Sequence, residues 1–121
     1  MSSDELFATA DFCLIPIGTG NGPSVAEHVA ECARVLEKTG LKYEMHGYGT
    51  NLEGPWTAVS SAIRACHAAV HAKGAPRIAT DIRIGTSAPG SKRKLMDGAR
   101  GENEHKVMRV RDILGRAKAK L

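Results

Sequence analysis

The stretch LKYEMHGYGTNLEG, residues 41–54, decides the fold of this chain. Apolar and polar side chains alternate along its first half, a period of two that is typical of a strand with one buried face. Gly47 and Gly49 then indicate a bend or a bulge. We therefore expect two short strands, about 41–46 and 48–53, which form a hairpin or one bent ribbon.

A helix is expected on each side of this hairpin. Upstream, Ser24 and Glu27 have the S-x-x-E spacing of a capping box, which satisfies two free backbone N–H groups. Gly40 suits the left-handed residue that stops this first helix. Downstream, Pro55 suits the first turn of a second helix, and Gly74 ends it. The predicted buried stripe of the second helix consists of Val59, Ile63, Cys66 and Val70.

One further strand is expected on each side of this helix–hairpin–helix unit. The run ADFCLIPI, residues 10–17, is dense in apolar residues, as expected in the middle of a sheet. The run RIATDIRIG, residues 77–85, alternates between two faces. The resulting order β-α-β-β-α-β is the split βαβ, or ferredoxin-like, pattern: an α+β sandwich of one antiparallel sheet with two helices on one face.

The 121 residues correspond to one domain. We expect an N-terminal tail over residues 1–9 and the ferredoxin-like domain over residues 10–86. A flexible basic loop over residues 87–101 and an extra C-terminal helix over residues 102–121 should follow. Because two helices cover one sheet face only, we expect a second copy of the chain to cover the other.

Charge and cysteine content limit the functional classes. The net charge is +4, but residues 1–86 hold 7 basic and 9 acidic side chains, whereas residues 87–121 hold 10 and 4. The three cysteines lie among apolar neighbours, which favours reduced thiols in a cytosolic protein. No apolar run suggests a transmembrane span and the N-terminus lacks the basic region of a signal peptide, so we expect a cytoplasmic location and no membrane partner.

The glycine loop after the first strand raises the question of nucleotide binding. Gly18 and Gly20 fit the first two glycines of G-x-G-x-x-G, but Pro23 occupies the third position and a hairpin follows the helix. A flexible turn is the favoured interpretation. An intermediate one is that the loop amides and the hydroxyls of Thr19 and Ser24 bind a polar ligand.

Catalytic, metal and nucleic-acid sites receive little support. His67 and His71 are four residues apart, but no base or third ligand is spaced to complete a zinc site. Cys66 and His67 are adjacent on a helix and point in different directions, so they cannot act as nucleophile and base. The basic end could meet phosphates. RNA-recognition domains carry aromatic residues on two central strands, whereas this chain has Phe12 on the first strand and no aromatic-rich run that resembles the second motif. A solvated surface or subunit packing is favoured.

The segment YGTNLEGPW carries the most suggestive chemistry. Thr50, Asn51 and Glu53 cluster before a helix, and Trp56, the only tryptophan, follows them. A hydroxyl, an amide, a carboxylate and a flat ring together suit a small aromatic heterocycle, especially a cationic one. The alternative is a hairpin edge followed by a helix start, at which Glu53 favours the helix dipole.

Three segments resemble the thiamine-binding protein family: CLIPIGTGNGPSVAEHV, YGTNLEGPWTAV with the T-x-x-E-G signature, and DIRIGT. The resemblance covers about residues 10–86. It implies a ferredoxin-like fold, dimers that associate into tetramers, thiamine or its pyrimidine half as ligand, and no catalysis. It places Thr50 and Glu53 at the pocket, with Ile17 and the Gly18 loop nearby.

We therefore expect a non-catalytic binding protein that forms a homodimer or homotetramer, with no cofactor and with thiamine as the possible ligand. The expected ligand-binding residues are Ile17, Gly18, Thr19, Ser24, Thr50, Asn51, Glu53 and Trp56. The main alternative is a structural or regulatory assembly module without a ligand. Nucleic-acid binding through the basic end is a third, weaker possibility.

Overall fold

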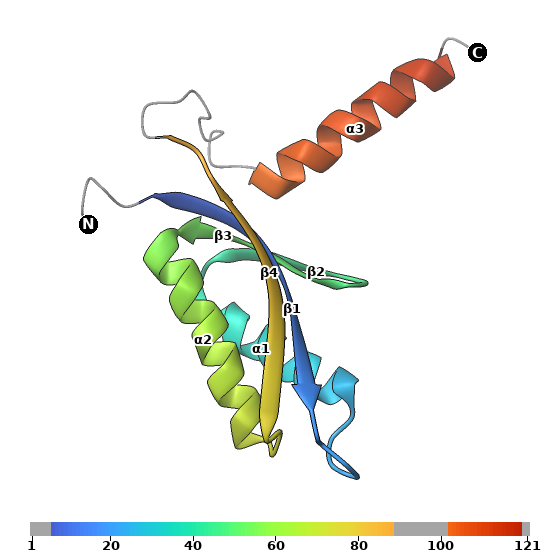
Figure 1. Ribbon diagram of the computed structural model, residues 1–121. Coiled ribbons are helices and arrows are strands. Elements are labelled where there is room, and N and C mark those ends of the chain that lie inside the picture. The colour runs from blue at the N-terminus through green and yellow to red at the C-terminus, as the bar shows by residue number, and fades with distance from the viewer. Residues whose placement is uncertain (1–5, 89–101, 120–121) are drawn as a thin grey trace.

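The computed structural model describes residues 6–88 and 102–119. The order of its elements confirms the expected α+β ferredoxin-like fold with an added C-terminal helix (Figure 1). Most of the predicted basic loop lies outside the described residues. The elements are β1 (Phe7–Ile17), α1 (Val25–Thr39), β2 (Lys42–His46), β3 (Gly49–Pro55), α2 (Trp56–Ala72), β4 (Arg77–Thr86) and α3 (Glu102–Ala119).

The four strands form one antiparallel sheet in the order β2-β3-β1-β4. Helices α1 and α2 lie against the same face of this sheet (Figure 1). β1 begins at Phe7 rather than at residue 10, because Ala8 and Thr9 are paired with β3 on one side and with β4 on the other. The opposite face of the sheet, here called the open face, carries no helix of this sandwich.

Alternation along β1 places the core between the sheet and the two helices. Ala8, Ala10, Phe12 and Leu14 are buried, whereas the residues between them point to the open face. The predicted stripe of α2 is buried against them, as expected. α1 adds three buried residues at a spacing of four: His28, Cys32 and Leu36.

Local sequence signals explain how the hairpin and α1 form. Ser24 and Glu27 make the predicted capping box, and Gly40 is the left-handed cap at the other end of α1. Gly49 allows β3 to approach β1 closely, because a Cβ atom there would lie 2.5 Å from the carbonyl oxygen of Phe12. At Gly54 a Cβ atom would lie 2.8 Å from Leu41 Cδ2, so a larger residue at the end of the T-x-x-E-G segment would require the Leu41 side chain to move.

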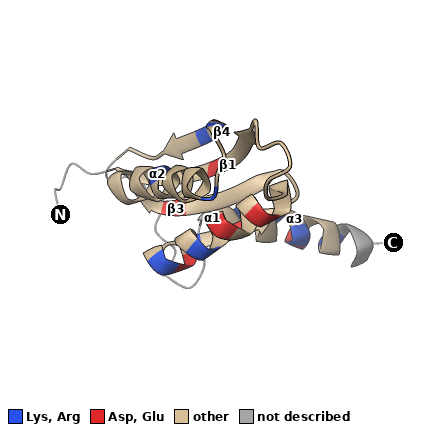
Figure 2. Ribbon diagram, turned by 90° about the horizontal axis from the view of Figure 1, so that it is seen from below, with Lys and Arg blue, Asp and Glu red and all other residues tan. Residues whose placement is uncertain are grey.

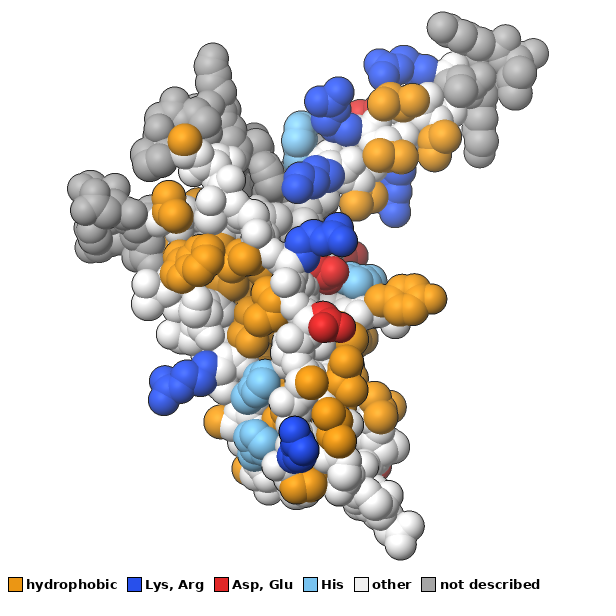
Figure 3. Space-filling view, in the orientation of Figure 1, with side chains coloured by type: hydrophobic (Ala, Val, Ile, Leu, Met, Phe, Trp, Pro, Cys, Tyr) orange, Lys and Arg blue, Asp and Glu red, His pale blue; other side chains and the backbone are white. Residues whose placement is uncertain are grey.

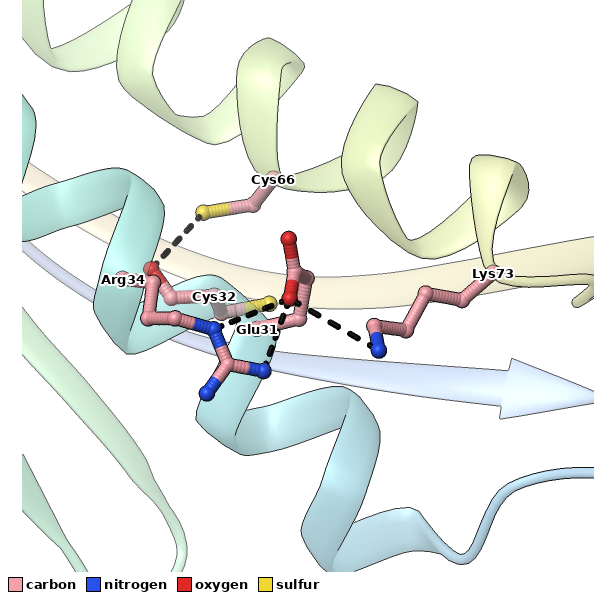
Figure 4. Close-up of polar contacts among 5 residues, drawn as sticks. All are labelled: Glu31, Cys32, Arg34, Cys66 and Lys73. Atoms are coloured by element: carbon pink, nitrogen blue, oxygen red, sulfur yellow. Dashed lines mark hydrogen bonds and ion pairs between the residues drawn. The ribbon is translucent and has the colours of Figure 1, made fainter.

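The two core helices are also joined by polar contacts (Figure 4). The Cys66 thiol donates to the carbonyl oxygen of Cys32 over 3.8 Å. The Glu31 carboxylate of α1 lies 2.8 Å from Arg34 of the same helix and 3.9 Å from Lys73 at the C-terminal end of α2. Acidic and basic residues both lie along α1 (Figure 2), where exposed ion pairs add little stability.

α3 starts beside β3 and then extends away from the sheet (Figure 1). Apolar side chains follow one another along the helix between basic ones (Figure 3). Within the part of the chain that the structure describes, no helix is long and apolar enough to cross a membrane. The apolar residues of α3 that are about half exposed are Val107, Val110, Ile113 and Leu114.

Candidate functional site

A polar cluster lies on the upper half of the open face, which is the half beside the start of β1 in Figure 1. The register of the strands brings its residues together. Asn51 of β3 lies directly opposite Asp11 of β1 on one side and Glu44 of β2 on the other. Glu53, two residues further along the same strand, lies opposite Thr9 and Lys42 in the same way. Cβ atoms of directly opposed residues are about 5 Å apart. Carboxylate and amide groups from three strands therefore gather on one surface.

The start of α3 covers part of this cluster. The backbone N–H of Asn103 donates to Glu53 Oε2 over 3.1 Å, and Lys42 Nζ lies 3.3 Å from Glu104 Oε1. Only 5% of Glu53 is exposed. A carboxylate is favoured at the N-terminal end of a helix, where free N–H groups point outward. Glu53 therefore fixes α3 to the sheet. The sequence suggested that Glu53 stabilises the start of the helix that follows it, α2, whereas in the structure it contacts the start of α3.

Two cavities open where α3 meets the open face. The first, of about 480 Å³, lies along β1 and β4, and the second, of about 440 Å³, lies along β2 and α3. Asn51 and Asn103 line both cavities, so the two adjoin. The side-chain nitrogen Nδ2 of Asn103 is buried and has no hydrogen-bond partner among the described residues. Both volumes fall in the range of about 300–1,000 Å³ typical of small-molecule sites.

A histidine holds the hairpin against β1 beside these cavities. His46 Nε2 lies 2.6 Å from Asp11 Oδ1, and His46 Nδ1 accepts the N–H of Tyr48 over 3.2 Å. Because Nδ1 accepts, the neutral ring carries its proton on Nε2 and donates it to the aspartate. Both ring nitrogens are engaged, so this pair clamps the hairpin and leaves no free nitrogen to act as a base.

Thr50 lies on the other side of the sheet from Asn51, because neighbouring residues of a strand face opposite ways. It lines a third, mainly apolar cavity of about 290 Å³ between the hairpin and α1. Phe12, Met45 and Val29 line the same cavity. The hydroxyl of Thr50 and the carboxylate of Glu53 therefore belong to different sites within one chain.

The other predicted ligand-binding residues lie at the two ends of the sheet. Ile17 ends β1, and Gly18, Thr19 and Ser24 form the connection to α1; Trp56 is the first residue of α2 at the opposite end. None of these five lines the three cavities above.

The glycine loop itself is explained as a turn. Gly18 and Gly20 have φ angles of 78° and 57°, which favour glycine. The N–H of Gly22 donates to the carbonyl oxygen of Thr19 over 2.8 Å, and the Ser24 hydroxyl caps α1. These backbone demands account for the glycine spacing.

The structure thus brings Asn51 and Glu53 together and adds residues that the sequence interpretation missed. Asp11 and Glu44 could have been predicted from the sequence. Asp11 is the one charged residue in the apolar run of residues 10–17, and Glu44 lies on the polar side of a strand whose residues alternate between apolar and polar. No local sequence signal could have found Asn103, which is 50 residues from its partner Glu53.

His67, His71 and Cys66 make contacts that stabilise the fold. His67 Nε2 lies 2.6 Å from the Thr80 hydroxyl, and His71 Nδ1 lies 2.8 Å from the carbonyl oxygen of Ala75. Burial, and then the charge of His71, lowers the pKa of His67. Contact with Cys32, together with burial, raises the pKa of the Cys66 thiol. Over the described residues, no three metal-ligating side chains are grouped as a metal site.

Comparison with known proteins identifies relatives over most of the sheet and both core helices. A family model described as thiamine-binding protein matches residues 10–98. A UPF0045 protein of Synechocystis is 54% identical over 76 residues, which are 63% of this chain and 61% of that protein. The chain therefore spans less than two thirds of the length of this relative.

Solved structures share the fold at low sequence identity. The chain matches a DUF77 domain from Bacillus cereus with a TM-score of 0.67 and 20% identity, over 82% of this chain and 92% of that one. A Thermotoga maritima protein, proposed to act in thiamine biosynthesis or salvage, matches with a TM-score of 0.55 and 18% identity, over 64% and 81%. At this level of identity, the likeness concerns the fold.

Proposed function

Since the chain belongs to the thiamine-binding protein family, we propose that it is a non-catalytic protein that binds thiamine or the aminopyrimidine half of thiamine. The ligand lies in the cavity between β2, β3 and the start of α3, beside Asn51 and Glu44. The protein acts as a homo-oligomer. The engaged nitrogens of His46 and the buried thiol of Cys66 support a binding role without catalysis.

The observation that carries this proposal is the position of Asn51 between two carboxylates. Its carboxamide can both donate to a ring nitrogen and accept from an exocyclic amine, as an aminopyrimidine requires. The flanking carboxylates of Glu44 and Asp11 stand opposite it in register. Carboxylates accept strong hydrogen bonds from an amine and attract a cationic ring. This group of side chains matches both halves of thiamine.

Calorimetric titration with thiamine tests the proposal. We expect a saturable signal with the unaltered protein and an affinity about 10- to 100-fold weaker in Glu44→Gln, since a hydrogen bond to a charged group contributes about 1.5–3 kcal/mol. Asn51→Leu should lose binding to a similar extent. Glu37→Gln, at an exposed carboxylate of α1, is the matched control and should bind as the unaltered protein does.

The result that contradicts the proposal is an absence of binding by the unaltered protein. Equal affinities in Glu44→Gln, Asn51→Leu and Glu37→Gln would place the ligand elsewhere, with the third cavity beside Thr50 as the next candidate. Thr50→Val would then be the informative variant.

Exposed apolar side chains support the homo-oligomer. Ile15 and Ile17 point to the open face and are 40% and 43% exposed. We expect a second copy to cover this lower half of the sheet, so that the chain sediments as a dimer or tetramer at micromolar concentration. Ile15→Lys should shift it toward the monomer, whereas Ala68→Lys, on the exposed side of α2, should not. A monomeric unaltered protein would contradict this part of the proposal.

A further inference from the structure

The larger cavity beside the proposed thiamine site has the opposite charge character. It is lined by two cations, Arg83 from β4 and Lys106 from α3. Neither forms an ion pair with a described residue. The hydroxyl-bearing residues Thr9, Thr86 and Ser87 line the same cavity. Cations and hydroxyl donors together are the groups that bind phosphate.

The carboxylate in this cavity does not cancel these cations by direct pairing. Asp11 lies opposite Arg83 in the strand register, but its Oδ1 is in contact with His46 at 2.6 Å. In the adjoining cavity, Lys42 is paired with Glu104 at 3.3 Å, and Arg111 is a further cation. Glu44 and Glu53 are the other acidic residues there, besides Glu104. The two cavities therefore form one trough. Carboxylates outnumber lysine and arginine in the part beside β2, whereas Arg83 and Lys106 outnumber the single carboxylate in the part beside β4.

We propose that this trough takes a phosphate ester, either of thiamine or of its pyrimidine half, with the phosphate between Arg83 and Lys106. The inference rests on the proposed function, because Asn51 and Glu44 hold the aminopyrimidine in the adjoining cavity. Asn51 and Asn103 line both cavities and mark the boundary over which such a ligand extends. Thiamine monophosphate has the same sequence of charges: a neutral aminopyrimidine, a cationic ring and an anionic phosphate.

The test compares thiamine monophosphate with thiamine on the same protein by calorimetry. We expect the monophosphate to bind at least about tenfold more tightly, since one charge-assisted hydrogen bond contributes about 1.5–3 kcal/mol. In Arg83→Gln and in Lys106→Gln this ratio should fall toward one. Arg64→Gln, at an exposed arginine of α2, is the control and should keep the ratio. Added salt should lower the ratio, because it screens the phosphate contacts.

The possible failures can be told apart. If thiamine binds but the monophosphate binds no more tightly, or if Arg83→Gln and Lys106→Gln keep the ratio, the phosphate subsite is refuted and thiamine binding stands. If neither compound binds, the proposed function fails and the subsite with it. Inorganic phosphate serves as a separate probe: at millimolar concentration it should weaken binding of the monophosphate more than binding of thiamine, and equal effects would contradict the subsite.

Discussion

Replacement of Gly49 by alanine tests why the hairpin segment has a glycine at this position. The added Cβ atom would lie 2.5 Å from the carbonyl oxygen of Phe12 and 3.1 Å from its carbonyl carbon. Both atoms belong to the backbone of the central strand, so no side-chain rotation can relieve the contact. Cβ atoms essentially never lie closer than 3.0 Å to a non-bonded heavy atom, so the Cβ atom and the carbonyl oxygen must move apart by at least 0.5 Å. This shift must separate β3 from β1 where the two strands pair.

We expect Gly49→Ala to lower the free energy of unfolding by about 2–3 kcal/mol, as overpacking in a rigid region does. For a chain of this size, this corresponds to about 8–12 °C in the melting temperature. Thermal unfolding followed by circular dichroism measures the change. The matched control is Gly47→Ala in the same hairpin, where nothing lies within 4 Å of the added atom and the effect should stay within about 0.5 kcal/mol. An equal loss of stability in both variants would refute the reasoning.

Three further changes test other parts of the structure. His28→Leu should raise the free energy of unfolding in denaturant by about 1 kcal/mol, because both nitrogens of this buried ring lack a hydrogen-bond partner among the described residues; a loss would show that the ring is satisfied. Ser24→Ala should cost about 1 kcal/mol but leave thiamine affinity unchanged in calorimetry, since Ser24 caps α1; weaker binding would return this residue to the ligand site. Because the pKa of His67 is lowered in the folded protein, the unfolded chain binds more protons at this residue than the folded chain does. The contribution of His67 to stability is therefore complete above the unfolded pKa of about 6.5 and declines as the pH falls below it. His67→Gln should therefore flatten the acid side of a stability–pH curve, and an unchanged curve would contradict this.

The sequence predicted the elements well because each carries a local signal. The Ser24–Glu27 box and Gly40 bound α1 as expected, and a stripe at helical spacing identified the buried side of α2. The start of β1 was placed too late, at residue 10, because pairing with β3 and β4 extends a strand beyond its apolar run. Strand ends depend on partners, and sequence patterns do not show these.

The candidate site was predicted only in part. Asn51 and Glu53 share the open face, whereas Thr50, which the sequence groups with them, faces α1 and another cavity. Trp56 and the Gly18 loop lie at opposite ends of the sheet. The sequence prediction placed these residues in one cluster because they are close together along the chain. Consecutive side chains of a strand point to opposite faces of the sheet, so some of these residues lie on one face and some on the other.

By itself, the sequence determined the fold class, the order of the elements and the buried stripe of α2, because these follow from hydrophobic period, capping and glycine positions acting over a few residues. Tertiary structure alone decided which polar groups meet. Register placed Asp11 and Glu44 on either side of Asn51, and the contact of Glu53 with Asn103 brought α3, with Lys106, to the edge of the same surface. These contacts join residues from three strands and a distant helix, so they depend on pairing geometry that no single segment contains.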